Sequence, residues 1–412
     1  MLFGAIGDDF TGSSDLGLML ADGGMRTVQY VGTPSEPADA DVDAGIVALK
    51  TRSVPVKEAI EKSLEAYQWL KAQGCQQFMF KYCSTFDSTA DGNIGQVIDA
   101  LVDEIGTDKP IVVCPVFPGA GRSIYQGHLF VNDTLLSESG MQNHPLTPMT
   151  DPDIRRVLAP QTVRKVGHLP LGDILKGNAH TKLLTEANEG RQLVVCDAVS
   201  EDNLYDIAKA AANFPLITGG SGIALGIPAN FGKTAANAAN WAKSNARVLC
   251  LSGSCSIATR GQIKEHENVG GSLLKLDADE VISGHMDAQK ALSWAKEQTT
   301  LPLIYSSDDP EQVKGVQDKY GLEVAASAFE NLFSEIANKA SAYGFGAIIS
   351  AGGETSGAVV EALNADALEI GPMIDPGVPA IKVSGQDLVL ALKSGNFGAP
   401  DFFEKAARVL SN

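Results

Sequence analysis

Short apolar runs alternate with amphipathic segments along almost the whole chain, and this alternation limits the possible folds more than any other feature. The runs 26–31 (RTVQYV), 44–49 (AGIVAL) and 110–117 (PIVVCPVF) are continuously apolar, which is typical of strands that are covered on both faces of a sheet. Residues 56–73 and 94–105 place apolar side chains at helical spacing. The sequence therefore predicts an α/β fold with mainly parallel sheets flanked by helices.

The length of the chain indicates two domains. Its 412 residues exceed what one hydrophobic core usually serves. The strand and helix pattern lapses in an Ala- and Asn-rich stretch before the strand RVLCLS. We therefore expect an N-terminal domain over 1–230, a linker over 231–246 and a C-terminal domain over 247–412. Each domain would carry its own mainly parallel sheet, with the active site in the cleft between them.

A second lapse lies inside the N-terminal half. Residues 123–150 show neither the strand nor the helix period, and they contain His128 and His144. Long irregular segments inside compact domains often act as functional lids. We expect the two histidines to be structural loop residues rather than catalysts.

The charge and the cysteine pattern narrow the class of protein. The net charge of −18 argues against nucleic acid or an anionic membrane as a partner, since both need a basic face. A small anionic substrate remains compatible, because a local Lys/Arg cluster can hold it. No apolar stretch reaches the length of a membrane span, no basic leader precedes the first strand, and the six cysteines form no CxxC pair. We expect a reduced, cytoplasmic, globular protein, with the oligomeric state left open, a homo-oligomer included.

Three apolar segments of the second half end in loops of small, glycine-rich or hydroxylated residues. The loops are 252–256 (SGSCS), 352–357 (GGETSG) and 394–396 (SGN). A strand, a glycine loop and a helix N-terminus together present backbone N–H groups to phosphate in α/β proteins. No loop matches GxxxxGK[ST], and no GxGxxG follows the first strand. The loops therefore predict a nucleotide site of unconventional sequence.

Polar residues follow the expected strands of the first half. Asp8 and Asp9 come directly after the apolar run 2–6. Carboxylates beside basic side chains suit a small, anionic, hydroxylated ligand, whose acid group the cations hold. Solvated strand ends, a surface ion pair at Arg52 and a helix cap at 87–93 are the structural alternatives. The further candidates are Lys50, Arg52, Lys81, Ser84, Thr85, Asp87, Ser88, Asn93 and Arg122.

Taken together, these motifs resemble those of the four-carbon acid sugar kinases. GAIGDDFTG, KYCSTFDST, LITGGSG, LSGSCS, SAGGETSG and LKSGNFG occur in order over essentially the whole chain. The resemblance implies an ATP-dependent kinase that phosphorylates the terminal hydroxyl of a four-carbon sugar acid. Its N-terminal domain would hold the acid, and its C-terminal domain would hold the nucleotide.

One departure from the family pattern bears on the substrate. Other branches read approximately K-x-D-S-T-L-R-G, whereas Ser84-Thr85 follows Lys81 here and a second DST begins at Asp87. Together with the stretches GHLFV and NHPLTPMTD, this departure favours the branch that acts on 3-oxo-tetronate. Threonate and erythronate remain the alternatives within the family.

The resemblance also implies site residues. We expect Asp8 and Asp9 to contact the hydroxyls of the acceptor, one as hydrogen-bond acceptor and the other, Asp9, as general base. Arg52 would fork onto the substrate carboxylate. The sugar-acid side comprises Asp8, Asp9, Arg52, Lys81, Ser84, Asp87 and Arg122, and the ATP side comprises Ser254, Gly352, Gly353, Glu354, Thr355, Gly395 and Asn396.

Phosphoryl transfer further implies Mg²⁺ that bridges the phosphates of ATP. No dedicated metal ligand can be identified from the sequence, and Glu354 and the aspartates are the candidates. Two other classes of function remain open. One is a non-catalytic two-domain protein that binds a sugar acid. The other is a nucleotide-sugar or dinucleotide enzyme, which the missing GxGxxG disfavours.

Overall fold

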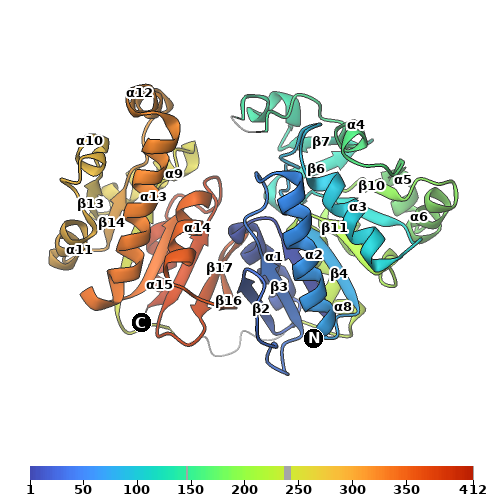
Figure 1. Ribbon diagram of the computed structural model, residues 1–412, viewed down its shortest axis with the longest axis horizontal. Helices are drawn as coiled ribbons and strands as arrows, with labels where there is room; N and C mark the ends of the chain where they lie inside the picture. The colour runs from blue at the N-terminus through green and yellow to red at the C-terminus, as the bar shows by residue number, and fades with distance from the viewer. Residues whose placement is uncertain (145–146, 236–242, 412) are drawn as a thin grey trace. The chain divides into compact units, whose positions relative to one another are not determined.

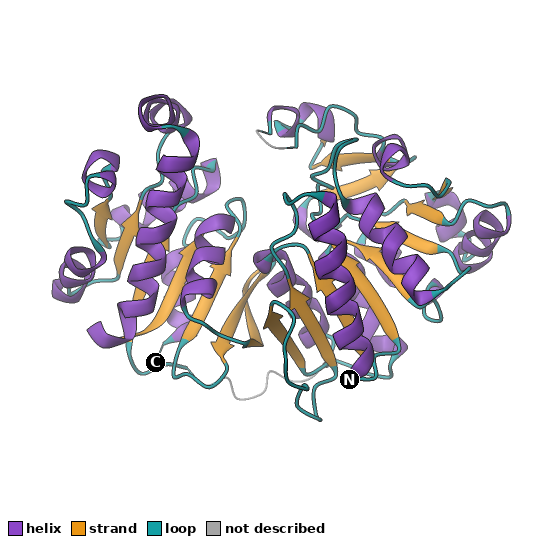
Figure 2. Ribbon diagram, in the orientation of Figure 1, coloured by secondary structure: helices purple, strands orange, loops and turns teal. Residues whose placement is uncertain are grey.

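The protein consists of two compact α/β units. The computed structural model describes residues 1–144, 147–235 and 243–411. The units are Met1–Asn237 and Ala238–Asn412, and in each of them helices flank a sheet (Figures 1 and 2). The predicted two-domain α/β class is therefore confirmed. The linker expected at 231–246 includes residues 236–242, which lie outside the described residues.

The first unit is built around a sheet of buried parallel strands. They are β1 (Phe3–Gly7), β2 (Thr27–Val31), β3 (Ala44–Ala48), β4 (Gln77–Lys81), β5 (Ile111–Cys114), β9 (Val166–Leu169), β10 (Leu193–Cys196) and β11 (Leu216–Gly219). Their order is β2-β3-β1-β4-β11-β5-β10-β9. The register places Gly7, Ala48, Lys81 and Gly219 level with one another. The loops after these strands therefore gather at one edge of the sheet.

The helices of the first unit cover both faces of its sheet. The crossover from β1 to β2 leads toward the β2 edge of the sheet, whereas the crossovers from β3 to β4 and from β4 to β5 lead toward the opposite edge. Right-handed connections therefore place the helix of the first crossover, α1, on one face and α2 and α3 on the other. In agreement, α2 packs on α3, and α1 packs on η5. The helices are α1 (Phe10–Asp22), α2 (Val56–Ala72), α3 (Ile94–Ile105), α4 (Ile154–Leu158), α5 (Leu171–Leu175), α6 (Ala179–Asn188), α7 (Glu201–Ala210) and α8 (Ile227–Asn230), with 3₁₀ turns η1 (Pro118–Ala120), η2 (Leu136–Glu138), η3 (Met141–Asn143), η4 (Ala159–Gln161) and η5 (Ser221–Gly226).

This topology creates a switch point between β1 and β4. The two strands are neighbours, but the chain leaves β1 toward β2 on one side and leaves β4 toward β5 on the other. Open α/β sheets bind ligands in the crevice outside the carboxyl ends of such strands. The residues that follow Gly7 and the residues from Lys81 onward are therefore placed at the expected ligand edge of the unit.

The stretch without a sequence pattern, 123–150, is more regular than expected. It contributes to a small antiparallel sheet of β6 (Arg122–Tyr125), β7 (His128–Val131) and β8 (Thr134–Leu135). Gly127 and Gln126 form the β6–β7 turn with positive φ angles of 77° and 52°. The strands are short and half exposed, which explains why their apolar pattern is weak. Residues 145–146 of this stretch lie outside the described residues.

The second unit combines parallel strands with an antiparallel hairpin. The strands are β12 (Arg247–Ser252), β13 (Ser272–Lys275), β14 (Pro302–Tyr305), β15 (Phe345–Ala351), β16 (Ala367–Asp375), β17 (Val378–Val383) and β18 (Val389–Lys393). Their order is β13-β14-β12-β15-β18-β17-β16. The strands from β13 to β18 in this order are parallel, whereas β17 runs antiparallel to both β18 and β16. The sequence reasoning did not identify this hairpin.

The second unit also has a switch point. The chain leaves β12 toward β13 on one side, and it leaves the neighbouring β15 toward β16 on the other. The glycine loops after β12 and β15 therefore flank this point. Figure 1 shows α13 and α14 side by side, in agreement with their contacts. The helices are α9 (Ile257–Asn268), α10 (Ala278–Ile282), α11 (Ala288–Glu297), α12 (Pro310–Tyr320), α13 (Leu322–Lys339), α14 (Gly353–Ala362) and α15 (Phe402–Leu410), with the 3₁₀ turn η6 (Ala340–Tyr343).

The state of the cysteines and the character of the helices bear on two expectations from composition. All six cysteines are free thiols, as the absence of a disulfide pattern predicts. Within the described ranges, no helix combines the length and the apolarity that a membrane crossing requires.

Candidate active site

Asp8 and Arg52 form a bidentate pair at the switch point of the first unit. Arg52 Nε donates to Asp8 Oδ2 at 2.9 Å, and Nη2 donates to Asp8 Oδ1 at 2.8 Å. The backbone fixes the same pair, because the N–H groups of Thr51 and Arg52 donate to the Asp8 carbonyl at 3.0 and 3.3 Å. Asp8 is only 4% exposed. The bidentate fork that we expected Arg52 to present to the substrate carboxylate is thus made with Asp8.

Asp9 shares the same guanidinium and also begins helix α1. Its Oδ1 accepts from Arg52 Nη2 at 2.8 Å. Its Oδ2 accepts from Thr11 Oγ1 at 2.9 Å and from the Gly12 N–H at 3.3 Å, which makes Asp9 the N-cap of the helix. One quarter of the Asp9 side chain is exposed, against 5% for Asp8. Of the two adjacent carboxylates, Asp9 is therefore the one that a ligand can reach.

The two aspartates have opposite pKa shifts. Burial raises the pKa of Asp8 above its ordinary value, and the opposing attraction of Arg52 does not cancel this effect. Burial also pushes the pKa of Asp9 upward, but Arg52, Lys81 and the hydrogen bonds from Thr11 and Gly12 outweigh it and lower the pKa. Asp9 is thus held in its ionised form.

Lys81 and Asp15 extend this charged cluster behind the switch point. Lys81 ends β4, is 3% exposed, and donates from Nζ to the Tyr82 carbonyl at 2.8 Å. A Cβ on Gly12 would lie 2.6 Å from Lys81 Nζ, so glycine at this position lets α1 approach the ammonium group closely. Asp15 on α1 accepts a hydrogen bond from Ser221, and its Oδ1 is buried without a hydrogen-bond partner in the described structure. Burial raises the pKa of Asp15 to about 6, and Lys81 and Asp9 are among the charges that act on it.

The segment after Lys81 adopts an unusual backbone conformation. Phe86 is fully buried at a φ of 66°, and Asp87 has a φ of 31°, which are conformations that non-glycine residues rarely adopt. Thr85 Oγ1 donates to Asp87 Oδ1 at 2.6 Å, which ties the two DST-like copies together. Ser88 is instead buried against Gln161, to which its hydroxyl donates at 3.1 Å.

Asn93 has a positioning role that differs from the helix cap considered above. It precedes α3 without a side-chain capping bond. Its Nδ2 donates to the carbonyls of Thr51 at 2.9 Å and Val54 at 3.2 Å, and so it holds the loop that carries Arg52.

The other predicted residues of the sugar-acid side occupy the same edge. Ser84 is half-buried, and its Cα lies 3.6 Å from the Cβ position of Gly220, which follows β11. Arg122 is half-buried, donates to the Ala120 carbonyl, and acts electrostatically on Asp15. Lys50 is exposed, in agreement with a solvated strand end.

The three glycine loops of the second unit meet at the carboxyl edge of its sheet. A Cβ on Gly395 would lie 2.5 Å from Ser254 Oγ, and a Cβ on Gly352 would lie 3.1 Å from the Ser254 backbone nitrogen. Gly352 also has a φ of 122°, which side chains strongly disfavour. Gly353, the first residue of α14, is exposed and has open space where a Cβ would point. The loops thus place the N-termini of α9 and α14 close together, as the strand pattern predicts.

A pocket of about 560 Å³ adjoins these loops within the second unit. Gly253 and Thr355 line one end of it; Thr355 lies in the first turn of α14, whereas the Gly253 N–H already donates to the Ala351 carbonyl at 3.1 Å. Apolar side chains of α12 and α13 line part of the rest, and polar side chains line the remainder, including the Lys275–Asp308 ion pair. The other charged and amide-bearing lining residues are Asp277, Asp279, Gln312, Gln317, Glu330 and Glu354. A pocket that combines an apolar wall with a few polar groups suits a planar ligand ring. The apolar lining residues are Leu276, Ala278, Val313, Val316, Ala325, Ala326, Phe329 and Phe333.

The remaining residues predicted to contact ATP differ in their position relative to this pocket. Glu354 and Thr355 line the pocket, whereas Asn396 is exposed and is absent from its described lining. Among the described residues, no group of three or more His, Cys, Asp or Glu side chains is arranged to hold a metal ion.

Lys393 is a residue that the sequence reasoning missed. It ends β18 immediately before the third glycine loop and is fully buried. A lysine directly after an apolar strand and before a glycine loop is the signal that could have identified it. Asp15 offered no comparable signal, because its partner Ser221 is distant in the sequence.

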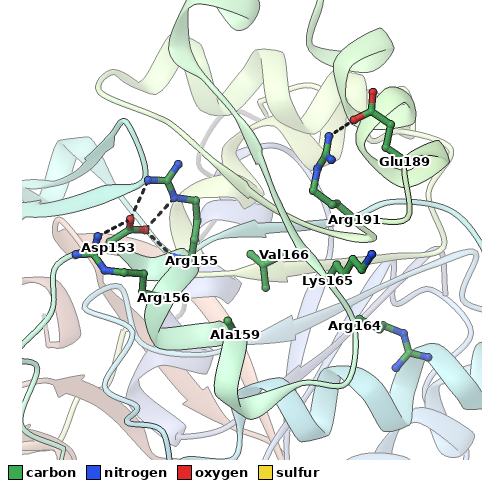
Figure 3. Close-up of a pocket in the computed structure, with 9 residues that line it drawn as sticks. All are labelled: Asp153, Arg155, Arg156, Ala159, Arg164, Lys165, Val166, Glu189 and Arg191. Atoms are coloured by element: carbon green, nitrogen blue, oxygen red, sulfur yellow. Dashed lines mark hydrogen bonds and ion pairs between the residues drawn. The ribbon is translucent and has the colours of Figure 1, made fainter.

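Figure 3 shows a different hollow of about 480 Å³ in the first unit, which is rich in arginine. It lies near residues 164–166, at the amino end of β9 and away from the carboxyl edge. Each arginine in its lining already pairs with a carboxylate, so the hollow offers an anion little free charge. The pairs are Arg155–Asp153, Arg156–Asp151, Arg164–Asp99 and Arg191–Glu186.

Two family models match separate parts of the chain. Residues 3–227 match the family model of a sugar-binding N-terminal domain, and residues 249–403 match that of a nucleotide-binding C-terminal domain. A 3-oxo-tetronate kinase of Burkholderia multivorans is 48% identical over 99% of this chain and 97% of its own. The chain belongs to the four-carbon acid sugar kinase family.

Solved structures of similar proteins support this assignment. The crystal structure of a Haemophilus influenzae protein has a TM-score of 0.80 and 42% identity, over 99% of this chain and 100% of its own. A protein from Salmonella typhimurium, described as a putative tRNA synthase, has a TM-score of 0.89 and 38% identity, over 99% of both chains. The expected family and fold are therefore confirmed for this sugar-acid kinase family member.

Proposed function

We propose that this protein is an ATP-dependent kinase that phosphorylates the terminal hydroxyl of 3-oxo-tetronate, giving 3-oxo-tetronate 4-phosphate. The observation that carries the proposal is the 48% identity to a 3-oxo-tetronate kinase over nearly the full length of both chains. A second relative with that name, from Haemophilus influenzae, is 43% identical over 98% of this chain. These relatives bear out the expected activity and favour 3-oxo-tetronate over threonate and erythronate. A non-catalytic binding protein is disfavoured.

The charged cluster of the first unit supports binding of the acid there. Lys81 and Arg52 supply positive charge beside Asp8 and Asp9, and such mixed charge suits a hydroxylated anion. The two bonds of Arg52 to Asp8 occupy Nε and Nη2, which leaves Nη1 as the edge that we assign to the substrate carboxylate. Ser84, Asp87 and Arg122 are further proposed contacts of the acid.

Asp9 is the residue that we propose as general base. A base must first be within reach of the hydroxyl, and Asp9 is more exposed than Asp8. The hydroxyl oxygen attacks the γ-phosphorus of ATP, its proton passes to Asp9, and the bond from the γ-phosphorus to the β-phosphate oxygen breaks to release ADP. Asp8 holds Arg52 in place. In such transfers the protein mainly positions the reactants and stabilises charge.

The pocket and loops of the second unit support binding of ATP. The apolar wall formed by α12 and α13 would hold the adenine, and the loops of Ser254, Gly352–Thr355 and Gly395 would hold the phosphates. Mg²⁺, when bound, would neutralise phosphate charge, with Glu354 as the proposed protein contact. Asn396 stays a proposed contact at the rim.

A kinase screen of the purified protein against four-carbon sugar acids tests the proposal. ADP release is measured with 3-oxo-tetronate, threonate and erythronate in the presence of ATP and Mg²⁺. We expect the largest kcat/KM with 3-oxo-tetronate. A larger value with threonate or erythronate would assign the protein to another branch. Tight binding of the acid without ADP release would instead support the non-catalytic alternative.

A further inference from the structure

Lys393 is a fully buried cation at the place where the glycine loops of the second unit meet. Its backbone carbonyl accepts a hydrogen bond from the Gly352 N–H at 2.9 Å, so it lies level with the start of the second loop. Its Nζ donates to the Gly395 carbonyl at 3.0 Å and to the Ser394 carbonyl at 3.1 Å in the third loop. It also donates to Thr259 Oγ1 at 2.8 Å in the first turn of α9.

All three hydrogen-bond acceptors of this ammonium group are neutral. Within the described structure no carboxylate forms an ion pair with Lys393, and the face of the Phe402 ring, 5.7 Å away, is its remaining electrostatic contact. The N-terminal turn of α9, on which Thr259 lies, adds positive dipole potential. A buried charge without a partner is strongly unfavourable, so the charged form of Lys393 is favoured only when a counter-charge lies nearby.

Several ionisable groups on the surrounding elements form ion pairs with groups other than Lys393. His266 on α9 pairs with Glu404 on α15, and Lys405 on α15 pairs with Asp375 on β16. Arg260 on α9 pairs with Asp309, and Arg408 on α15 pairs with Asp401. The other charged groups on the elements packed around Lys393 are Lys264, Glu265, Glu267, Glu361, Lys382 and the exposed Glu354 at the start of α14. Burial is the one cause of the Lys393 pKa shift, with no charged group contributing.

We infer that Lys393 is a positioning residue whose ammonium group serves as the buried counter-charge for the phosphates of bound nucleotide. This inference rests on the proposed function. It adds one residue to the proposed nucleotide site and one proton that is taken up when the nucleotide binds. Lys393 would hold the Gly395 loop in place through its hydrogen bonds to the loop carbonyls. Its positive charge would also stabilise the negative charge of the phosphates. Its ammonium group would become fully charged when the phosphates arrive.

The proton balance gives this inference a measurable consequence. Burial lowers the pKa of Lys393 to about 7, so a large share of the side chains are neutral at pH 8 in the free protein. Phosphate charge nearby favours the charged form, and nucleotide binding at pH 8 should therefore take up close to one proton from solution. Above pH 7 the affinity for ATP should then fall by up to about tenfold for each pH unit.

The test is calorimetric titration of the full-length protein with ATP and Mg²⁺, without a sugar acid. Titrations at pH 8 in buffers of different ionisation enthalpy give the number of protons taken up. We expect uptake by the wild type and by Lys339→Met, a control that removes an exposed lysine paired with Glu335. Lys393→Met should take up none, and its affinity should be at least tenfold weaker near pH 6.5 and approach that of the wild type near pH 9.

The outcomes separate the inference from the proposed function. ATP binding with the same proton uptake in Lys393→Met and wild type would overturn the inference, as would a loss of affinity in the variant that is equal at every pH. If Lys393→Met does not fold, the wild type alone decides: pH-independent ATP affinity between pH 7 and 9 would also overturn it. A wild type that binds no ATP at any pH would contradict the proposed function itself.

Discussion

Arg52 holds Asp8 with two parallel hydrogen bonds and reaches Asp9 with one nitrogen of the same pair. One guanidinium therefore relieves the repulsion between two adjacent carboxylates at the end of β1. Without it, the strand would place two negative charges side by side at a partly buried site. This relationship explains how two adjacent aspartates, Asp8 and Asp9, can both be accommodated at this position, and a change of Arg52 should affect both of them.

Arg52→Lys should impair catalysis, because a single ammonium group cannot make the bidentate contact. Loss of a charged hydrogen bond costs roughly 1.5–3 kcal/mol. Arg52 also lowers the pKa of Asp9 through its charge, which lysine keeps, so Arg52→Met should raise that pKa and move the acid limb of the kcat/KM profile to higher pH. The measurement is a pH–rate series, with Arg26→Lys as control, since Arg26 is an exposed arginine paired with Asp41. An unchanged acid limb in Arg52→Met, or normal kcat/KM in Arg52→Lys, would contradict the role given to Arg52.

Asp9→Asn should lower kcat by about 10²–10⁴, the usual effect of removing a general base. Asparagine keeps the shape of the side chain and can still accept a bond from the Gly12 N–H, so α1 should keep its cap. Asp8→Asn should instead act through a weaker hold on Arg52 and raise the KM for the sugar acid. Steady-state kinetics measure both effects, and calorimetry should give near-normal ATP affinity for both. Wild-type kcat in Asp9→Asn would remove Asp9 from the chemistry.

Gly353→Val should abolish ATP binding without unfolding the protein. The Cβ of residue 353 would point into open space, so no protein atom is displaced, but the methyl groups would occupy the space proposed for phosphate. Gly261→Val is the matched control, since Gly261 lies on α9 of the same unit and its Cβ would also meet nothing within 4 Å. Calorimetry measures affinity, and a thermal melt checks folding. Unchanged ATP affinity in folded Gly353→Val would remove this loop from the nucleotide site.

Much of the site follows from the sequence because parallel strands end at one edge. Asp8, Asp9 and Lys81 follow or end apolar runs, so their common location is predictable once those runs are recognised as parallel strands. The convergence of the three glycine loops follows for the same reason. Arg52 was predicted at this edge as well, but its pairing with Asp8 depends on the exact path of a loop.

Other features depend on packing between distant segments, which no local pattern records. Lys393 is buried because α9 and α15 cover the end of β18, and Asp15 is buried because η5 brings Ser221 against α1. The small sheet of β6–β8 lacks a strand period because its strands are short and half exposed. In each case the structural role is set by tertiary contacts rather than by local sequence.

Asp15→Asn should stabilise the first unit at alkaline pH. Burial raises the pKa of Asp15 from 3.8 to about 6 in the folded protein. The folded state therefore binds a proton more tightly than the unfolded state does, and stability falls as the pH rises from about 4 to above 6. Above pH 6 the folded protein carries a buried carboxylate whose ionisation costs up to about 3 kcal/mol. Asparagine removes this charge and can still accept the bond from Ser221.

Urea unfolding of the first unit, followed at pH 8 and toward pH 4, measures this effect. The variant should be more stable than the wild type at pH 8, and the difference should decline toward zero as the pH approaches 4. Asp206→Asn, which changes an exposed carboxylate on α7, is the control and should show no such trend. A difference that does not change with pH would mean that the substitution acts through packing, and a loss of stability at pH 8 would mean that the ionised carboxylate is favourable where it lies. The pH dependence of the stability difference thus decides whether the ionised Asp15 carboxylate destabilises the folded protein.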